Sequence, residues 1–376
     1  MPHRFGPDYS SKQKKPAAVV TPAGKPGMTL VELMIVLLVS IIVLGAAFSL
    51  YQVNARYHVA QDSLLEQMQN LRSALYSVAR DVRMSGNGLG LMGAGRVHIY
   101  INDTAFSQTL GIAPGWFRYN SSSKPGVRAI FGRDGGTAGS DTLTIFRTEM
   151  ESPQAVGSLA GTYDVGSDSA LTLRELLKDG LLNDGDMIAV ANGGTVVVLQ
   201  AGDVNSAGGA TSITLGPRFK PGSEPFGESF PEGSNVYRLR DVTLVTYFLD
   251  QDNNCLMANY YDFTDGRNKD NPYSETGGPV VLANDIEDFQ VGYILNNQAG
   301  GNQLTNITVE HGLTDELLAS GRWVRAVRLA LVSKSQIKNE TTAAGRPVSV
   351  FNRQPGGVAD GYQRRVLSDT VYLRNY

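Results

Sequence analysis

The chain has a single cysteine, Cys255, among 376 residues. A secreted fold held together by disulfides is therefore excluded, and a lone cysteine is usually a small buried hydrophobe. Charged residues make up 18% of the chain and the net charge is −3, so the bulk charge does not indicate a nucleic-acid partner. The HExxH, GxSxG and P-loop motifs are absent. We therefore predict no enzyme activity, no catalytic or metal-ligating residues and no cofactor.

Charge and proline are both missing from a long segment that begins about 30 residues into the chain. No charged residue occurs from Leu33 to Leu50, and no proline occurs from Thr29 to Ala113. Extended to residues 28–51, the apolar run is long enough to span a bilayer, which needs about 20 residues. Residues 1–27 are rich in proline and carry basic residues against a single acid, Asp8. This basic flank predicts a cytoplasmic N-terminus and an exported body.

The apolar pattern changes after Tyr51 from an all-round surface to a single helical stripe. Residues 52–84 repeat apolar side chains every three or four positions, which predicts an amphipathic helix that lies on a sheet. The stripe comprises Val53, Tyr57, Ala60, Leu64, Met68, Leu71, Leu75, Val78 and Val82. Charged residues, including Arg80 and Asp81, are expected largely off this stripe. One helix is thus predicted from about Met28 to about Met84.

One acid, Glu32, interrupts the apolar run near its start. A carboxylate at membrane depth is costly, so such a residue indicates a functional site by default. The alternative is structural: Thr29-Leu30-Val31-Glu32 matches the capping box, in which the two polar side chains satisfy N–H groups at a helix start. The residue types alone leave both interpretations open.

The string from Gly27 to Ile35, GMTLVELMI, resembles the prepilin peptidase site of type IV pilins and of type II secretion pseudopilins. The resemblance implies cleavage between Gly27 and Met28, N-methylation of Met28 and a role for Glu32 in subunit assembly. Met28 stands where the family usually has phenylalanine, and Pro26 where a basic residue is common. A rival interpretation is an ordinary secretory signal cut after Gly45-Ala46-Ala47. The long segment before the apolar core and the acid inside it argue against that rival.

Residues 85–376 read as a β-rich body. Runs of β-branched residues predict strands at 141–148, 186–191, 195–200, 211–215, 241–250, 254–261, 289–295, 323–333 and 366–373. Asn192-Gly193-Gly194 predicts a hairpin turn, and residues 171–178 a short helix. The stretch 71–90, the hairpin GDMIAVANGG, the pair DIEDFQVGY and WVRAVRLALV, and RRVLSDTVYLRN resemble PilW-like minor pilins. Segments 95–165 and 296–320 have no counterpart in that family.

Two local patterns resemble ligand-binding motifs but are interpreted as loops with a structural role. Gly88, Gly90 and Gly93 satisfy G-x-G-x-x-G, but the string follows a helix and so predicts an exit loop instead of a dinucleotide site. The acidic stretch Asp250–Asn254, with Asp262, Asp265 and Asp270 after it, is rich in the oxygen ligands that calcium prefers. It lacks the spacing of a calcium loop, so we interpret it as a solvated hairpin tip.

These observations predict an α+β fold of the type IV pilin kind. The expected domains are a leader (1–27), a long helix (28–84) with transmembrane (28–51) and amphipathic (52–84) halves, and a β-rich extracytoplasmic head (85–376) packed on the second half. The resemblance implies a single-pass inner-membrane protein that passes into a filament in the periplasm or outside the cell. Implied partners are the prepilin peptidase, other pilins, the inner-membrane assembly platform and lipid along 28–51.

The implied function is a minor pilin that acts in type IV pilus assembly, at initiation or at the tip. The large head indicates a low-copy position. The alternatives are a J-type pseudopilin of type II secretion and a pilus-tip adhesin that binds a surface or DNA.

Overall fold

The computed structural model describes residues 27–85, 96–101, 115–117, 130–136, 139–150, 154–165, 167–178, 180–192, 195–216, 229–262, 278–296, 309–310, 323–338, 348–354 and 359–373. The chain divides into two compact units, residues 1–59 and residues 60–376. One helix, α1 (Leu30–Met84), is followed by strands in the second unit. The predicted fold class, a long apolar N-terminal helix and a β-rich head, is confirmed.

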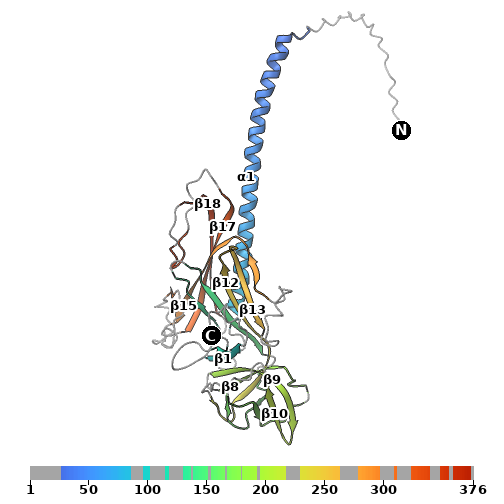
Figure 1. The fold of residues 1–376 in the computed structure, drawn as a ribbon, viewed down its shortest axis with the longest axis vertical. Coiled ribbons are helices and arrows are strands. Elements are labelled where there is room, and N and C mark those ends of the chain that lie inside the picture. The colour runs from blue at the N-terminus through green and yellow to red at the C-terminus, as the bar shows by residue number, and fades with distance from the viewer. Residues whose placement is uncertain are drawn as a thin grey trace, which may run out of the picture. The chain divides into compact units, whose positions relative to one another are not determined.

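The strands are shown in Figure 1. Their bounds are β1 Arg96–Ile101, β2 Gly115–Phe117, β3 Ile130–Arg133, β4 Thr142–Met150, β5 Gly157–Ser158, β6 Tyr163–Asp164, β7 Ala170–Leu173, β8 Met187–Asn192, β9 Thr195–Ala207, β10 Ala210–Leu215, β11 Ser229–Phe230, β12 Asn235–Asp250, β13 Cys255–Asp262, β14 Val280–Ala283, β15 Ile286–Asn296, β16 Val309–Glu310, β17 Trp323–Lys338 and β18 Tyr362–Tyr372.

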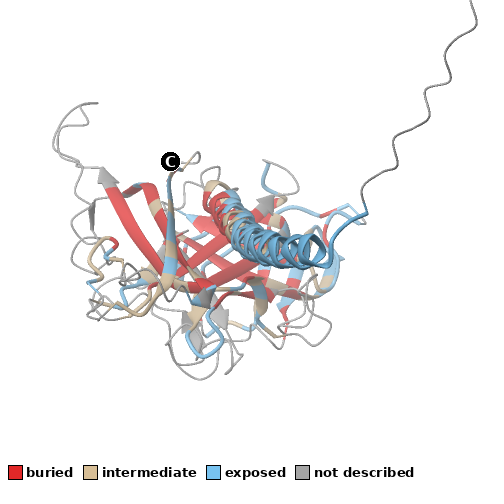
Figure 2. Ribbon diagram, turned by 90° about the horizontal axis from the view of Figure 1, so that it is seen from above, coloured by how far each residue is buried: buried red, intermediate tan, exposed pale blue. Residues whose placement is uncertain are grey.

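Two antiparallel systems make the part of the head that covers α1. The first contains the path β14-β13-β12 with β4 paired to β12 and β3 to β4; the second is the four-stranded sheet β16-β15-β17-β18. Both systems and the helix contribute to one hydrophobic core, which includes Leu71, Val78, Tyr247, Phe289 and Leu329. Figure 2 shows this pattern as buried residues on the strands beneath the helix.

Helix α1 is buried only in its last turns. Its buried residues are Gln67, Leu71, Ala74, Leu75, Val78, Ala79, Asp81 and Val82. The predicted stripe is therefore covered by the head from about Leu71 onward, whereas Val53 and Tyr57 are 57% and 67% exposed. The expectation that Asp81 lies off the buried face is wrong, because this carboxylate is fully buried.

Asp81 is buried because the sheet supplies partners for it. The hydroxyl of Tyr247 on β12 donates to Asp81 Oδ2 at 2.6 Å, and Arg147 Nη1 on β4 lies 3.2 Å from Oδ1. Arg80 reaches the same oxygen at 3.3 Å. Burial, with the Asp81 charge beside it, holds the pKa of Tyr247 well above its usual range. The carboxylate thus connects the last turns of α1 to two strands.

A second buried carboxylate, Asp141, joins β4 to β15. Its N–H donates to Phe289 O at 2.8 Å, while Oδ2 accepts from the N–H of Val291 at 2.7 Å and Oδ1 from that of Gly135 at 2.9 Å. Burial is the main cause that raises the pKa of Asp141 to about 7, against these two hydrogen bonds. The nearby charges of Asp134 and Asp288 add to the rise. The two systems of strands are therefore connected by a carboxylate that titrates near neutral pH.

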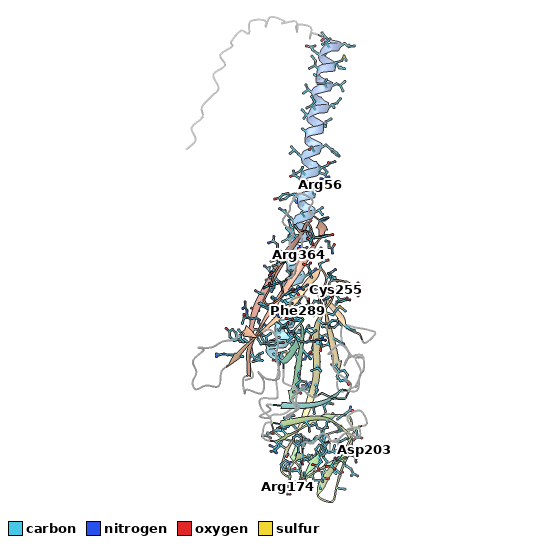
Figure 3. All side chains as sticks on the ribbon, turned by 60° about the vertical axis from the view of Figure 1, so that its left-hand side comes forward. Arg56, Arg174, Asp203, Cys255, Phe289 and Arg364 are labelled. Carbon is cyan, nitrogen blue, oxygen red and sulfur yellow. The ribbon has the colours of Figure 1, made fainter. Side chains whose placement is uncertain are left out.

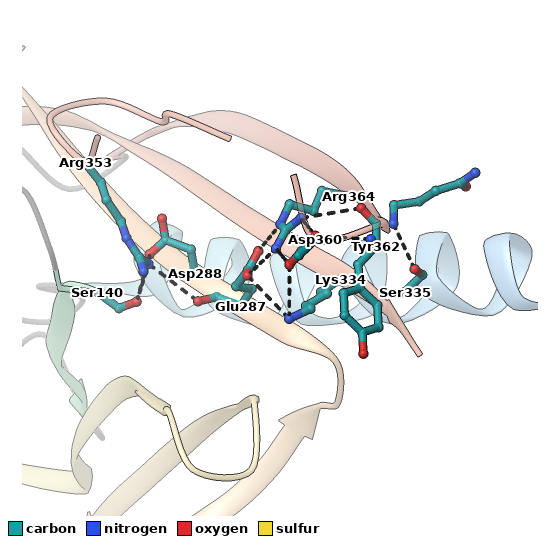
Figure 4. Close-up of polar contacts among 10 residues, drawn as sticks. Ser140, Glu287, Asp288, Lys334, Ser335, Arg353, Asp360, Tyr362 and Arg364 are labelled. Atoms are coloured by element: carbon teal, nitrogen blue, oxygen red, sulfur yellow. Dashed lines mark hydrogen bonds and ion pairs between the residues drawn. The ribbon is translucent and has the colours of Figure 1, made fainter. Parts of the chain in front are cut away.

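Ion pairs, drawn in Figure 4, connect the edge strand β18 and the residues before it to β15 and β17. Arg364 of β18 is 3% exposed and lies against Glu287 of β15 and, at 2.7 Å, against Asp360. Lys334 of β17 lies 3.7 Å from Asp360 and stacks over the ring of Tyr362 at 4.3 Å. The neighbouring guanidinium holds the pKa of Asp360 well below its usual range.

Most of the predicted strands are present, and β8 and β9 pair with Asn192 opposite Thr195, although the Gly193-Gly194 turn lies outside the described residues. The short helix predicted at 171–178 is wrong. Residues 170–173 instead form β7, which pairs with β10, because the alternation Leu171, Leu173 buries both leucines on one face of a strand.

We expect that removing residues 1–51 leaves a folded, soluble head, whereas removing residues 1–84 causes aggregation. The longer deletion strips Leu71, Leu75, Val78 and Val82 from the core. Each such side chain contributes about 1.5–3 kcal/mol, against a total stability of about 5–15 kcal/mol. Size-exclusion chromatography and circular dichroism report the outcome. Equal solubility and folding of the two proteins would contradict the packing described above.

The raised pKa of Asp141 predicts a pH dependence of stability. Since the folded pKa lies above the unfolded one, the folded state binds the extra proton, and stability decreases as pH rises from about 4 to about 7. A tenfold difference in proton affinity between the folded and unfolded states is worth about 1.4 kcal/mol. In urea denaturation of the soluble head, Asp141→Asn should flatten this part of the pH profile. Asp250→Asn is the control. Hydrogen bonds from Asn253 lower the pKa of Asp250, so the contribution of this carboxylate is lost only below about pH 4, and the variant should leave the range above that pH unchanged. Equal slopes for wild type and Asp141→Asn would refute the prediction.

Candidate processing and assembly segment

The predicted cleavage bond lies in a non-helical stretch. Residues 27–29 precede the first residue of α1, Leu30. Gly27 is exposed, and a side chain placed at this position would meet no atom within 4 Å. Met28 is 60% exposed. The bond between Gly27 and Met28 is thus accessible in non-helical backbone directly before a helix.

Glu32 and Thr29 form a reciprocal capping box at the start of α1. The N–H of Thr29 donates to Glu32 Oε2 at 2.9 Å, and the N–H of Glu32 donates to Thr29 Oγ1 at 3.2 Å. The Thr29 hydroxyl also lies 3.1 Å from Oε2. Two N–H groups that lack helical partners are satisfied in this way. The structural interpretation of Glu32 therefore holds within one subunit.

The geometry leaves room for a second role, because both hydrogen bonds to the carboxylate use the same oxygen. Thr29 N–H and Thr29 Oγ1 both bind Oε2, and Oε1 accepts no hydrogen bond from any residue in the described part of the chain. A carboxylate has about four lone-pair sites. Capping and pairing with an amine of another molecule are thus compatible.

The surface of α1 after Glu32 is apolar on all sides. The 23 residues between Glu32 and Arg56 contain no charge, which corresponds to about 35 Å of helix at 1.5 Å per residue. An 18-residue window of α1 reaches a mean hydropathy of 2.9, and none of it is buried. Figure 3 shows these side chains projecting around the helix as far as Arg56. By length and composition this helix can cross a membrane.

Apolar exposure continues beyond the predicted membrane segment. Val53, Tyr57, Val59 and Leu65 are 57%, 67%, 56% and 62% exposed. These residues lie between the end of the predicted span and the first buried residue of α1, Gln67. Val53 and Tyr57, four residues apart, share one face of the helix, and exposed apolar patches mark interaction surfaces in soluble proteins. The helical spacing of the apolar residues alone does not distinguish this exposed surface from the face that the head covers.

The other sequence-level candidates have structural roles or lie outside the described residues. Asp250 caps its own hairpin tip, since its carboxylate accepts from the N–H groups of Asp252 and Asn253. Cys255 is buried, with Sγ 3.2 Å from Asn284 Oδ1. Among the described residues, no group of three or more His, Cys, Asp or Glu is placed to hold a metal. The glycine string 88–93, Asp265 and Asp270 fall outside the described ranges.

The C-terminal strands match a known family. Residues 246–375 match the model of type IV pilus-assembly protein W, and this range runs from the second half of β12 through β18. No curated protein matches the chain significantly.

Among solved structures, a type IV-like pilin from Thermus thermophilus matches with 18% identity and a TM-score of 0.21, over 52% of this chain and 86% of that one. A TM-score of 0.21 is too low for this likeness to bear on the fold. The family match implies a structural role in the pilus and interaction with other pilus components, and together with the apolar helix it is consistent with membrane anchoring. The C-terminal strands are thus similar to type IV pilus-assembly protein W, and in this chain they belong to a β-rich head that follows a long apolar helix, α1.

Proposed function

We propose that this chain is a minor pilin, made as a precursor in the bacterial inner membrane and assembled into a type IV pilus at its initiation or tip. The observation that carries the proposal is the uncovered apolar surface of α1. It extends from the predicted membrane segment to Leu65, so part of it would face water in a free subunit. Neighbouring pilin helices are the partners that would cover it, because apolar helices associate through such faces.

Processing would occur at the start of this helix. The prepilin peptidase would cut the bond after Gly27, and Met28 would become the N-methylated first residue. The exposed, non-helical backbone at 27–29 supports access by a peptidase, and the basic residues of 1–27 favour a cytoplasmic location for the bond.

Glu32 would then serve assembly in addition to capping. In a packed bundle its Oε1 would accept a hydrogen bond from the Met28 amine of a neighbouring subunit. The pair offsets the cost of burying both charges in an apolar environment. Oε2 would remain in the capping box with Thr29.

The adhesin and pseudopilin alternatives are tested by different experiments. An adhesin requires that the purified head bind a surface or DNA, whereas a scaffold does not. The type II secretion assignment depends on the machinery that the subunit joins, which co-purification of filaments from the native host would identify. The family match favours the pilus over the secretion system.

Processing is tested by Gly27→Leu. A bulky residue before the cleaved bond should leave the full-length precursor in the membrane, while Gly24→Leu, a matched change within the leader, should be processed normally. Intact mass and N-terminal analysis of protein from the native host give the result. A wild-type N-terminus at Phe48, as signal peptidase would produce after Ala47, would refute the pilin-type processing.

The pairing role of Glu32 is tested by two variants, one that removes the charge of Glu32 and one that weakens the helix cap. Glu32→Gln keeps an acceptor for the box but removes the charge, and leaving a buried partner unpaired costs roughly 3–5 kcal/mol. We expect normal cleavage and loss from sheared filaments. Thr29→Ala keeps the charge and weakens the cap by about 1 kcal/mol, so it should still be incorporated. If processed Glu32→Gln reaches filaments at the wild-type level, Glu32 is only a helix cap.

A further inference from the structure

Two large hydrophobic clusters among the described residues of the head occupy different parts of the chain. The first is the core on α1, whose members lie at or before Ile145 or at or after Val245. The second contains, among others, Leu171, Ile213 and Phe230, and all of its members lie between Leu159 and Val236. No residue belongs to both clusters.

The second cluster belongs to a segment that leaves and re-enters the head at neighbouring positions. Strands β4 and β12 pair antiparallel, with Met150 opposite Leu239. Residues directly opposite each other in such a pair have Cα atoms about 4.5–5.5 Å apart. The chain between them, residues 151–238, is therefore an insertion into what would otherwise be a β-hairpin.

The family match lies outside the inserted segment, although the hairpin at residues 185–194 within the segment resembles PilW-like minor pilins in sequence. The match to pilus-assembly protein W begins at residue 246, after the segment has ended. Every apolar residue of α1 assigned to a core belongs to the first cluster. In Figure 3, Arg174 and Asp203 of the segment lie at the other end of the head from Phe289 and Arg364.

We propose that residues 151–238 form an accessory module with its own hydrophobic core, which the subunit does not need for processing or incorporation. Assembly would depend on α1 and on the strands of the first cluster. The module would add a part that is displayed by the subunit and does not take part in helix packing. The assembly half of this inference rests on the proposed function; the folding half does not.

The module and the rest of the head share one continuous sheet, in which β12 pairs with β8 and β1 pairs with β9. Strand β12 is shared: Val236 belongs to the second cluster and Val245 to the first. A register shift between Leu239 and Asp241 interrupts the pairing of β12 with β4. The pairing of β12 with β8 ends at the same place, at Leu239. On the other face of β8 and β9, Ala189, Val196 and Val198 are buried but belong to neither cluster. Coupling between the module and the rest of the head would pass through these side chains and through the paired strands.

The folding half is tested on the full chain in detergent by hydrogen exchange, with one cavity variant in each cluster. Ile213→Ala and Leu329→Ala each truncate a side chain with 0% exposure. We expect Ile213→Ala to accelerate exchange by at least about tenfold in β7, β9 and β10 and to leave β15 and β17 unchanged. Leu329→Ala should show the reverse pattern. Equal acceleration in both clusters by either variant would overturn the separate core.

The functional half is tested by incorporation of the same variants into filaments in the native host. Ile213→Ala should be processed and incorporated at the wild-type level, whereas Leu329→Ala should be incorporated less. Reduced incorporation of processed Ile213→Ala would overturn the accessory role. Glu32→Gln in the same assay reports on the proposed function alone, because it changes neither cluster. Normal incorporation of that variant would count against Glu32 pairing and leave the module inference standing.

Discussion

The contact between the last turns of α1 and the head is the constraint on which the remaining structure depends. Leu71, Val78 and Val82 supply the apolar area, but apolar area alone would allow the helix to slide or rotate. Asp81 prevents this, because a buried carboxylate separated from its partners costs several kcal/mol. Its partners, Tyr247 and Arg147, lie on two different strands, so a shift by one helical turn would leave the charge unpaired.

Elements with a local cause could be predicted from the sequence, and those that depend on distant partners could not. The helix follows from the proline-free apolar pattern, and β12 and β17 from their β-branched runs. The burial of Asp81 could not be predicted because its partners are 66 and 166 residues away in the chain. Residues 171–178 could not be assigned correctly because a short apolar run is ambiguous until its partner strand, here β10, is known.

The candidate segment shows the same division. The cleavage site at Gly27 and Met28 remains a prediction from the local sequence, whereas the capping box of Thr29 and Glu32 forms as its pattern predicts. The extent of the uncovered apolar surface could not be recognised. A stripe that a sheet covers and a stripe that another subunit would cover have the same helical period, so only the exposure of Val53 and Tyr57 separates them.

A glutamate at position 32 has the chemistry for both the helix cap and the proposed pairing. A glutamine offers one side-chain oxygen, which the cap alone would occupy, whereas a carboxylate offers two. With Oε2 held by Thr29, the same side chain can present Oε1 and a negative charge to an amine. In lipid no water is available to form hydrogen bonds with the helix N–H groups or with that amine. A single acidic residue would thus satisfy the end of its own helix and select the end of a neighbour, which is why cap and assembly role need not be alternatives.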